Sequence, residues 1–188
     1  MKVLVIVEDP TLDQYIAKPI VEQLFAVLGR KARVDVLTDP HLRGIDEALD
    51  SSILRDIIAD NPMEELFILL VDRDCNRFNS EQRAGERETE HAGKLVFGLA
   101  IEELEVWMLA LHREELAVGF SKVREHCDPK ETFAEPFLQK RGWSTELGRG
   151  RKRAMRAIGS EWKGLLAVCP ELEELRGKLE SVLSSRPG

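Results

Sequence analysis

Three carboxylate residues follow apolar runs in the sequence and could together bind a metal ion. Glu8 follows the apolar, β-branched run at residues 2–7, and Asp72 and Asp74 follow the apolar run at 66–71. Neither run alternates with polar residues, which is typical of strands buried on both faces of a parallel sheet. Because the carboxyl ends of parallel strands open onto one crevice, we expect the three side chains to meet there.

The cation expected at this cluster is Mg²⁺ or Mn²⁺. Asp72 and Asp74 are two residues apart, so in extended backbone they point to the same side, where their charges repel unless a cation neutralises them. Mg²⁺ prefers oxygen ligands and is commonly held by a few carboxylates together with substrate phosphates. The alternative is that these loop acids only cap helices, since Asp and Glu account for 34 of the 188 residues.

The elements that position these acids are predicted from the hydrophobic pattern. Strands are expected at 2–7, 34–37, 66–71 and 94–101, with helices at 11–28 and 45–59. Residues 72–93 are too hydrophilic for the core, and beyond residue 102 helices are expected at 102–111, 129–140, 151–158 and 170–183. The predicted fold class is α/β, an open, mostly parallel sheet flanked by helices, with a helical C-terminal third. We expect one compact unit, made of an α/β domain at 1–111 and a helical extension at 112–188.

The charge of the chain is unevenly distributed. Lys and Arg total 27, for a net charge of −7, which argues against nucleic acid binding by the whole surface. Residues 139–163 nevertheless hold eight basic and two acidic residues. This segment is expected either to bind a nucleic acid backbone or to pair with acids of the same molecule, and the sequence favours neither. The nucleic-acid-binding residues on the first interpretation are Arg149, Arg151, Lys152, Arg153 and Arg156.

The tryptophans and histidines carry weaker signals. Trp107 belongs to an apolar helical stripe, which favours core packing over base stacking. Trp143 and Trp162 flank the basic segment, an arrangement that single-strand-binding proteins use. The four histidines show no telling spacing from a nucleophile and are expected at the surface or as capping residues.

The cysteine count and the apolar runs indicate where the protein resides. Cys75, Cys127 and Cys169 are an odd number without zinc-type spacing, so we expect free thiols in a reducing compartment and neither a disulfide framework nor a structural zinc. The longest apolar run, at 66–71, is too short to span a membrane, and the run at 3–7 is too short for a signal peptide. The predicted location is cytoplasmic, with no membrane partner.

The residues around the predicted strands resemble a known family. Glu8 after a first strand, followed by Asp-x-Asp after a later one, resembles the TOPRIM domain of topoisomerases, primases and OLD-type nucleases. A closer resemblance, over most of the chain, is to an uncharacterised bacterial family with a TOPRIM-like fold, at residues 7–13, 70–74, 101–107 and 150–158. The resemblance implies that Glu8, Asp72 and Asp74 bind metal, that Glu8 is also a general acid or base, and that Glu103 is a further catalytic residue or metal ligand. The spacing of Glu102, Glu103 and Glu105 fits first-turn acids of a helix equally well.

The predicted function is a Mg²⁺-dependent, nuclease-like enzyme acting on phosphodiesters, in which acids bind metal and the basic segment holds nucleic acid. OLD-type nucleases carry an ATPase, but this sequence has no Gly-x-x-x-x-Gly-Lys-[Ser/Thr] motif, so an ATPase partner would be a separate chain. An alternative is a non-catalytic regulatory subunit that binds nucleic acid or protein. It is favoured by Asp9, since TOPRIM domains usually have glycine after the conserved Glu. A phosphatase or nucleotide-processing enzyme is a third interpretation.

Overall fold

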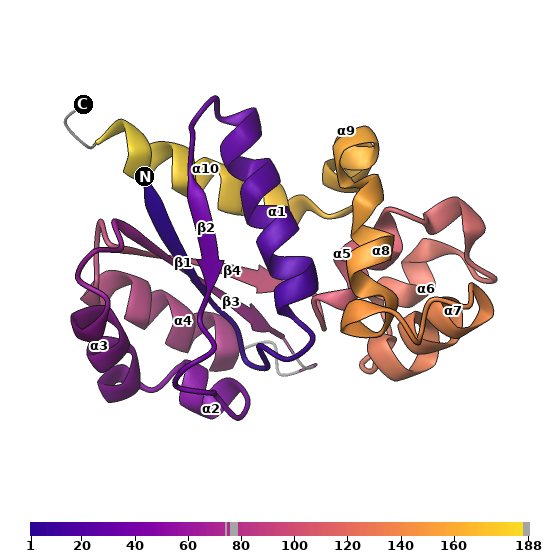
Figure 1. The fold of residues 1–188 in the computed structure, drawn as a ribbon, viewed down its shortest axis with the longest axis horizontal. Helices are drawn as coiled ribbons and strands as arrows, with labels where there is room; N and C mark the ends of the chain where they lie inside the picture. Colours follow the sequence, from indigo (N-terminus) through magenta and orange to yellow (C-terminus); the bar gives the residue numbers. More distant parts are fainter. Residues whose placement is uncertain (74, 76–78, 186–188) are drawn as a thin grey trace.

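The sheet has four strands, all parallel, in the order β2-β1-β3-β4. The computed structural model describes residues 1–73, 75 and 79–185. The strands are β1 (Lys2–Ile6), β2 (Arg33–Val36), β3 (Leu66–Asp72) and β4 (Leu95–Ala100). Helices flank the sheet and also form the C-terminal region (Figure 1). The predicted α/β architecture is confirmed.

The chain reverses its direction of travel across the sheet between β1 and β3. From β1 it passes through α1 (Gln14–Val27) to β2 on one side, and it later enters β3 on the other side of β1. Such a switch point leaves a crevice at the carboxyl ends of the two strands, where open α/β sheets bind their ligands. Glu8 and Asp72 lie at these two strand ends.

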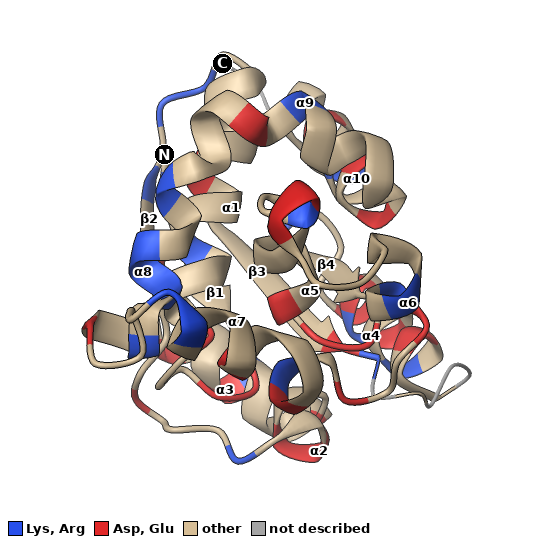
Figure 2. Cartoon of the chain, turned by 90° about the vertical axis from the view of Figure 1, so that its right-hand side faces the viewer, with Lys and Arg blue, Asp and Glu red and all other residues tan. Residues whose placement is uncertain are grey.

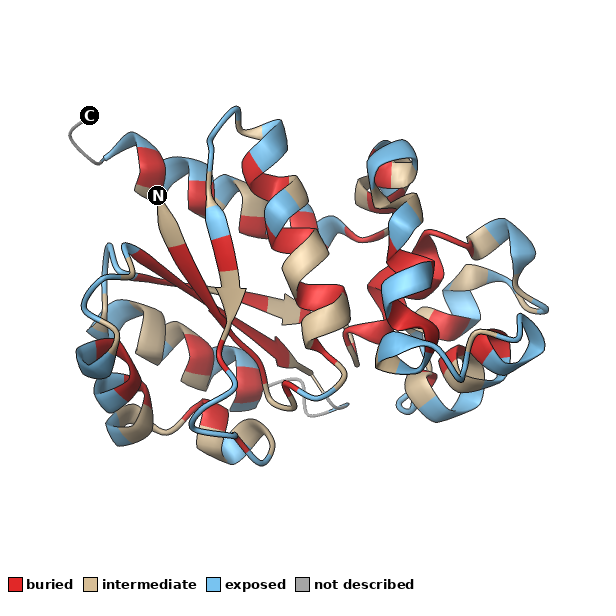
Figure 3. Cartoon of the chain, in the orientation of Figure 1, coloured by how far each residue is buried: buried red, intermediate tan, exposed pale blue. Residues whose placement is uncertain are grey.

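Two apolar layers cover the two faces of the sheet. Side chains alternate along β1, so that Val3 and Val5 face one layer and Leu4 and Ile6 face the other. The first layer includes α1 and the C-terminal helices, and the second includes the helices between β2 and β4. Strands β1 and β3 are therefore largely buried on both faces, whereas β2 is buried only at Val34 (Figure 3). This explains why β1 and β3 are continuous apolar runs in the sequence.

The helices of the second layer lie between β2 and β4 in the sequence. They are α2 (Ile45–Ala48), α3 (Ser51–Asp60) and α4 (Asn79–Glu90). The single helix expected at 45–59 is divided because the carboxylate of Asp50 accepts hydrogen bonds from the backbone N–H groups of Ser52 and Ile53 and so starts a new helix. The polar composition of 72–93 did not indicate α4, of which only Ser80 and Ala84 are buried.

The C-terminal region forms a helical lobe beside the sheet and then returns to it (Figure 1). Its α-helices are α5 (Glu105–Ala110), α6 (Phe120–Arg124), α7 (Glu135–Lys140), α8 (Arg151–Ala154), α9 (Ile158–Val168) and α10 (Pro170–Ser184). Shorter 3₁₀ turns lie at Arg113–Glu115, Leu147–Gly150 and Met155–Ala157, and a π-helical turn lies at Lys130–Ala134. One apolar core runs from the sheet through this lobe, and the predicted division at residue 111 stays a prediction.

Helix α10 packs directly on the edge strand β4. At Gly98 a Cβ atom would lie 2.9 Å from Cδ2 of Leu175 and 2.9 Å from Cδ2 of Leu70, so a bare backbone is needed for this close approach. The last helix thus belongs to the same layer as α1. Within the described residues, no helix has both the length and the apolar composition needed to cross a membrane.

Candidate functional site

Glu8 and Asp72 meet at the switch point of the sheet. The backbone N–H of Asp72 donates a hydrogen bond of 2.8 Å to Oε1 of Glu8. Oδ1 of Asp72 in turn accepts a hydrogen bond of 2.9 Å from the backbone N–H of Leu104. One oxygen of each carboxylate is therefore fixed by the backbone of a neighbouring segment. The structure brings together two of the three predicted metal ligands, and the third, Asp74, lies outside the described residues.

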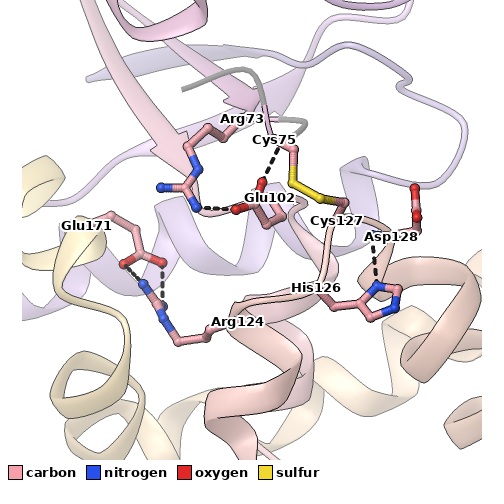
Figure 4. Close-up of polar contacts among 8 residues, drawn as sticks. All are labelled: Arg73, Cys75, Glu102, Arg124, His126, Cys127, Asp128 and Glu171. Atoms are coloured by element: carbon pink, nitrogen blue, oxygen red, sulfur yellow. Dashed lines mark hydrogen bonds and ion pairs between the residues drawn. A yellow bond between two sulfur atoms is a disulfide. The ribbon is translucent and has the colours of Figure 1, made fainter. Parts of the chain in front are cut away.

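Glu102 is a buried carboxylate that is not among the predicted site residues. Its side chain is fully buried, its Oε1 pairs with the guanidinium of Arg73, and its Oε2 accepts a hydrogen bond of 2.7 Å from the backbone N–H of Cys75 (Figure 4). Its backbone φ is 67°, and that of Cys75 is 54°. Non-glycine residues in this left-handed region cost about 1–3 kcal/mol each and persist where surrounding contacts hold them. Nothing in the sequence marks this conformation.

Glu103, the predicted catalytic residue or metal ligand, directly precedes Leu104, whose backbone N–H donates a hydrogen bond to Asp72. Its Oε2 accepts a hydrogen bond of 2.7 Å from the backbone N–H of Lys130. Burial raises the pKa of Glu103 to about 7, with nearby Glu105 adding to the effect. A carboxyl with this pKa can hold or release a proton near neutral pH, which suits a general acid or base.

Asp13 is a second carboxyl with a raised pKa near this edge. It is 5% exposed, and its Oδ2 accepts a hydrogen bond of 3.2 Å from the backbone N–H of Asp9. Burial, reinforced by the charge of Glu105, raises the pKa of Asp13 to about 7. Burial would also raise the pKa of Asp9, but hydrogen bonds from Thr11 outweigh it and the pKa is lowered. In the sequence, a contact between Asp9 and Asp13 is indicated by their spacing, since they lie four residues apart just before a helix.

The carboxylates of Glu8 and Asp72 are of a type that binds a hard cation. Mg²⁺ is commonly bound by one or two carboxylates while it keeps several waters for exchange with phosphate oxygens. Glu8 and Asp72 supply that donor type. Across residues 1–73, 75 and 79–185, no three His, Cys, Asp or Glu side chains are grouped so as to hold a metal ion. The predicted Mg²⁺ or Mn²⁺ therefore stays a prediction.

Arg151 does not belong to the predicted nucleic-acid-binding surface. Its side chain is fully buried, and its Nε and Nη2 donate hydrogen bonds of 2.9 Å and 2.6 Å to Oε1 of Glu105. Glu105 is itself 1% exposed. The prediction was wrong for this residue because a buried carboxylate on α5 neutralises it, and α5 is distant in the sequence.

The other four predicted basic residues are exposed. Lys152 and Arg156 lie on the surface of α8 and the turn that follows, and Arg149 precedes that helix, with Nη1 3.7 Å from Oε1 of Glu135. Arg153 pairs with Glu146 and lies over the ring of Trp143. Figure 2 shows Lys and Arg along α8. Pairing with acids of the same molecule is thus observed for Arg149 and Arg153, and nucleic acid binding by the exposed residues stays a prediction.

The tryptophans are mainly structural. Trp107 is fully buried, as predicted, and its Nε1–H donates a hydrogen bond of 2.9 Å to Glu171. Trp162 is also buried, so it cannot stack on a nucleic acid base.

The prediction for the histidines was wrong for His112, which is buried with Nε2 3.0 Å from the carbonyl oxygen of Ala154. Burial lowers the pKa of His112.

Two of the three cysteines form a disulfide. Cys75 and Cys127 are bonded to each other, so the prediction of free thiols was wrong for both (Figure 4). Cys169 is free and buried, and burial raises its pKa to about 12. The pairing joins residues 52 positions apart, which their spacing does not reveal. Because these two thiols are bonded to each other, the cysteines no longer indicate a reducing compartment.

Comparison of the chain with protein-family models, with curated proteins and with solved structures finds no significant match. The resemblance to TOPRIM domains stays a prediction.

Proposed function

We propose that the protein is a Mg²⁺-dependent, TOPRIM-like enzyme that hydrolyses phosphodiesters in nucleic acid. The observation that carries the proposal is the hydrogen bond between the backbone N–H of Asp72 and Glu8 Oε1, which brings the Glu8 carboxylate to the residue bearing the second carboxylate, at the switch point of a parallel sheet. This is the place where open α/β sheets bind ligands, and paired carboxylates are suited to a divalent cation. Such a cation, when bound, provides Lewis-acid activation of phosphate and water.

Different residues of the chain would bind the cation, transfer the proton and hold the substrate. Glu8 and Asp72 would hold the cation, and the backbone N–H groups that bind them fix their orientation. Glu103, with its pKa of about 7, would take or give a proton during hydrolysis. Exposed Lys152 and Arg156 would hold the phosphate backbone of the nucleic acid substrate.

The test is cleavage of labelled single-stranded and duplex DNA and RNA with Mg²⁺ or Mn²⁺. Glu8→Gln and Asp72→Asn keep an oxygen that can accept the same backbone hydrogen bonds while removing the charge. We expect cleavage by the wild type and a loss of at least about a hundredfold in both variants. Glu22→Gln and Asp56→Asn, at exposed positions on α1 and α3, are the matched controls and should keep full activity. Hydrolysis of a small phosphomonoester alone would support a phosphatase instead.

A non-catalytic regulatory subunit is the second candidate, favoured by Asp9. Where TOPRIM domains usually have glycine, this chain has a carboxylate whose Oδ1 accepts a hydrogen bond of 2.8 Å from Thr11 N–H. Nucleic acid binding without cleavage, unaffected by Asp72→Asn, would favour this candidate. A separate ATPase partner and a cytoplasmic location stay predictions.

A further inference from the structure

We propose that the Cys75–Cys127 disulfide is a reversible exchange site for dithiols, and that its state determines how firmly the backbone of Cys75 is held against Glu102. The bond joins Cys75, three residues after the end of β3, to Cys127 in the loop that follows α6. It lies beside the buried Arg73–Glu102 ion pair (Figure 4). This inference is independent of the proposed phosphodiester chemistry.

The two bonded cysteines are accessible to a reagent, whereas the third is not. Cys75 and Cys127 are both exposed, while Cys169 is fully buried within the core. Thiol exchange requires direct attack of a thiolate on a sulfur atom, so exposure decides which site reacts. A dithiol can therefore reach the disulfide in the folded protein, and Cys169 serves as an internal control.

The disulfide is coupled to the buried carboxylate of Glu102 through the backbone of Cys75. Its N–H donates a hydrogen bond of 2.7 Å to Oε2 of Glu102, whose other oxygen pairs with Arg73. Both Cys75 and Glu102 have left-handed backbones, with φ of 54° and 67°. Such conformations persist only where several contacts impose them. Reduction removes one of these contacts, so the hydrogen bond from Cys75 to Glu102 should open more often.

The loop that carries Cys127 is held in place by contacts that do not involve sulfur. On one side, Arg124 donates hydrogen bonds of 3.0 Å and 3.1 Å to the carboxylate of Glu171 on α10. On the other side, Lys130 N–H donates to Glu103 over 2.7 Å. The reduced chain should therefore stay folded, with its two thiols close enough to form the bond again. This separates an exchange site from a disulfide on which the fold depends.

The exchange balances as a two-electron reaction. One thiolate of the dithiol attacks a sulfur of the pair, the S–S bond breaks, and the released cysteine thiolate takes up a proton. The second thiolate of the reagent then attacks the mixed disulfide and releases the other cysteine, which is protonated in turn. Two electrons pass to the protein, and the reagent leaves as a cyclic disulfide. An oxidised reagent of the same class reverses the reaction.

The test uses the folded full-length chain titrated with dithiothreitol without denaturant. Cysteines are counted by maleimide labelling, and amide hydrogen exchange is measured over residues 2–6, 66–75 and 95–107. We expect two labelled cysteines in the reduced protein, roughly tenfold or more faster exchange at the Cys75 amide, and unchanged exchange in β1 and β3. Cys75→Ser/Cys127→Ser is the matched variant and should behave like the reduced wild type with or without reagent. Reoxidation should restore the original exchange rate.

Three results would overturn the proposal. The first is a disulfide that resists dithiothreitol in the folded chain. The second is reduction accompanied by faster exchange throughout the sheet, which would make the bond a requirement of the fold. The third is full reduction with no change at the Cys75 amide, which would show that the bond does not control its contact with Glu102.

Discussion

The backbone N–H of Asp72 donates a hydrogen bond of 2.8 Å to Oε1 of Glu8, which ties the end of β3 to the end of β1. The two strands pair in register up to Ile6 and Leu69, so both acids lie just beyond the paired region. The contact from Leu104 N–H to Oδ1 of Asp72 then connects this edge to the helical lobe. The carboxylates are thus positioned by the backbone before any ligand binds, which is the arrangement a preorganised site needs.

Asp13 should make the stability of the fold depend on pH. Its pKa is about 7 in the folded state against 3.8 in the unfolded chain, so between these values the folded state keeps a proton that the unfolded state has released. The free energy of unfolding should therefore fall as pH rises through this window, by at most about 1.4 kcal/mol per pH unit for this group. Asp13→Asn resembles the protonated form and should flatten the dependence.

Urea unfolding at pH 5 and pH 8 checks this expectation. The variant should gain stability relative to the wild type at the higher pH and match it more closely at the lower one. Parallel behaviour of the two proteins at both pH values would show that Asp13 is ionised in the folded state. Glu103→Gln should act in the same direction, since burial also raises the pKa of Glu103 to about 7.

Removing either partner of the buried Glu105–Arg151 pair should destabilise the protein strongly. Arg151→Met leaves the carboxylate of Glu105 without its two hydrogen bonds in a fully buried position. The expected loss is about 3–5 kcal/mol in the free energy of unfolding, measured by chemical denaturation. Arg153→Met is the matched control, because Arg153 pairs with Glu146 at the surface and should cost less than about 1 kcal/mol. Equal effects would contradict the assignment of Arg151 to the core.

Exposed basic residues after Gly150 should contribute to nucleic acid binding through phosphate contacts. Lys152→Gln and Arg156→Gln should each weaken binding to single-stranded and duplex DNA without regard to sequence. Each lost contact should also reduce the slope of log affinity against log salt by about 0.7 to 0.9. Fluorescence anisotropy at several salt concentrations measures both effects. Lys31→Gln, exposed between α1 and β2, should leave them unchanged, and an equal loss in this control would indicate only non-specific attraction.

Gly98 should be intolerant of any side chain. A methyl group there meets Leu175 and Leu70 at 2.9 Å, so Gly98→Ala should push α10 away from β4 and cost about 1–3 kcal/mol in thermal or chemical unfolding. Gly177→Ala on the same helix meets nothing within 4 Å and should stabilise the protein by about 0.5–1 kcal/mol. A neutral Gly98→Ala variant would show that the close packing is not required.

The strands could be predicted because burial leaves a direct mark on their composition. β1 and β3 are covered on both faces, so their residues are apolar without alternation. The convergence of Glu8 and Asp72 followed from parallel topology alone. Helix α4 gave no such signal, since it contributes only Ser80 and Ala84 to the core.

Other features depended on contacts between distant segments. Arg151 has the composition of a surface residue, and only its pairing with Glu105 on another helix places it in the core. Glu102 is distinguished by a left-handed backbone that no neighbouring glycine indicates. The disulfide between Cys75 and Cys127 likewise arises from the packing of the lobe against the sheet edge. None of these contacts is encoded in local sequence periodicity.

Whether Glu8 and Asp72 share a divalent cation is tested by Mn²⁺ binding, measured by the electron paramagnetic resonance signal of the free ion. We expect the wild type to bind Mn²⁺ in competition with Mg²⁺. Glu8→Gln and Asp72→Asn should each weaken binding by about tenfold or more, whereas Glu22→Gln and Asp56→Asn should not. Mn²⁺ affinity that is the same in all five proteins would contradict the claim that Glu8 and Asp72 share a divalent cation.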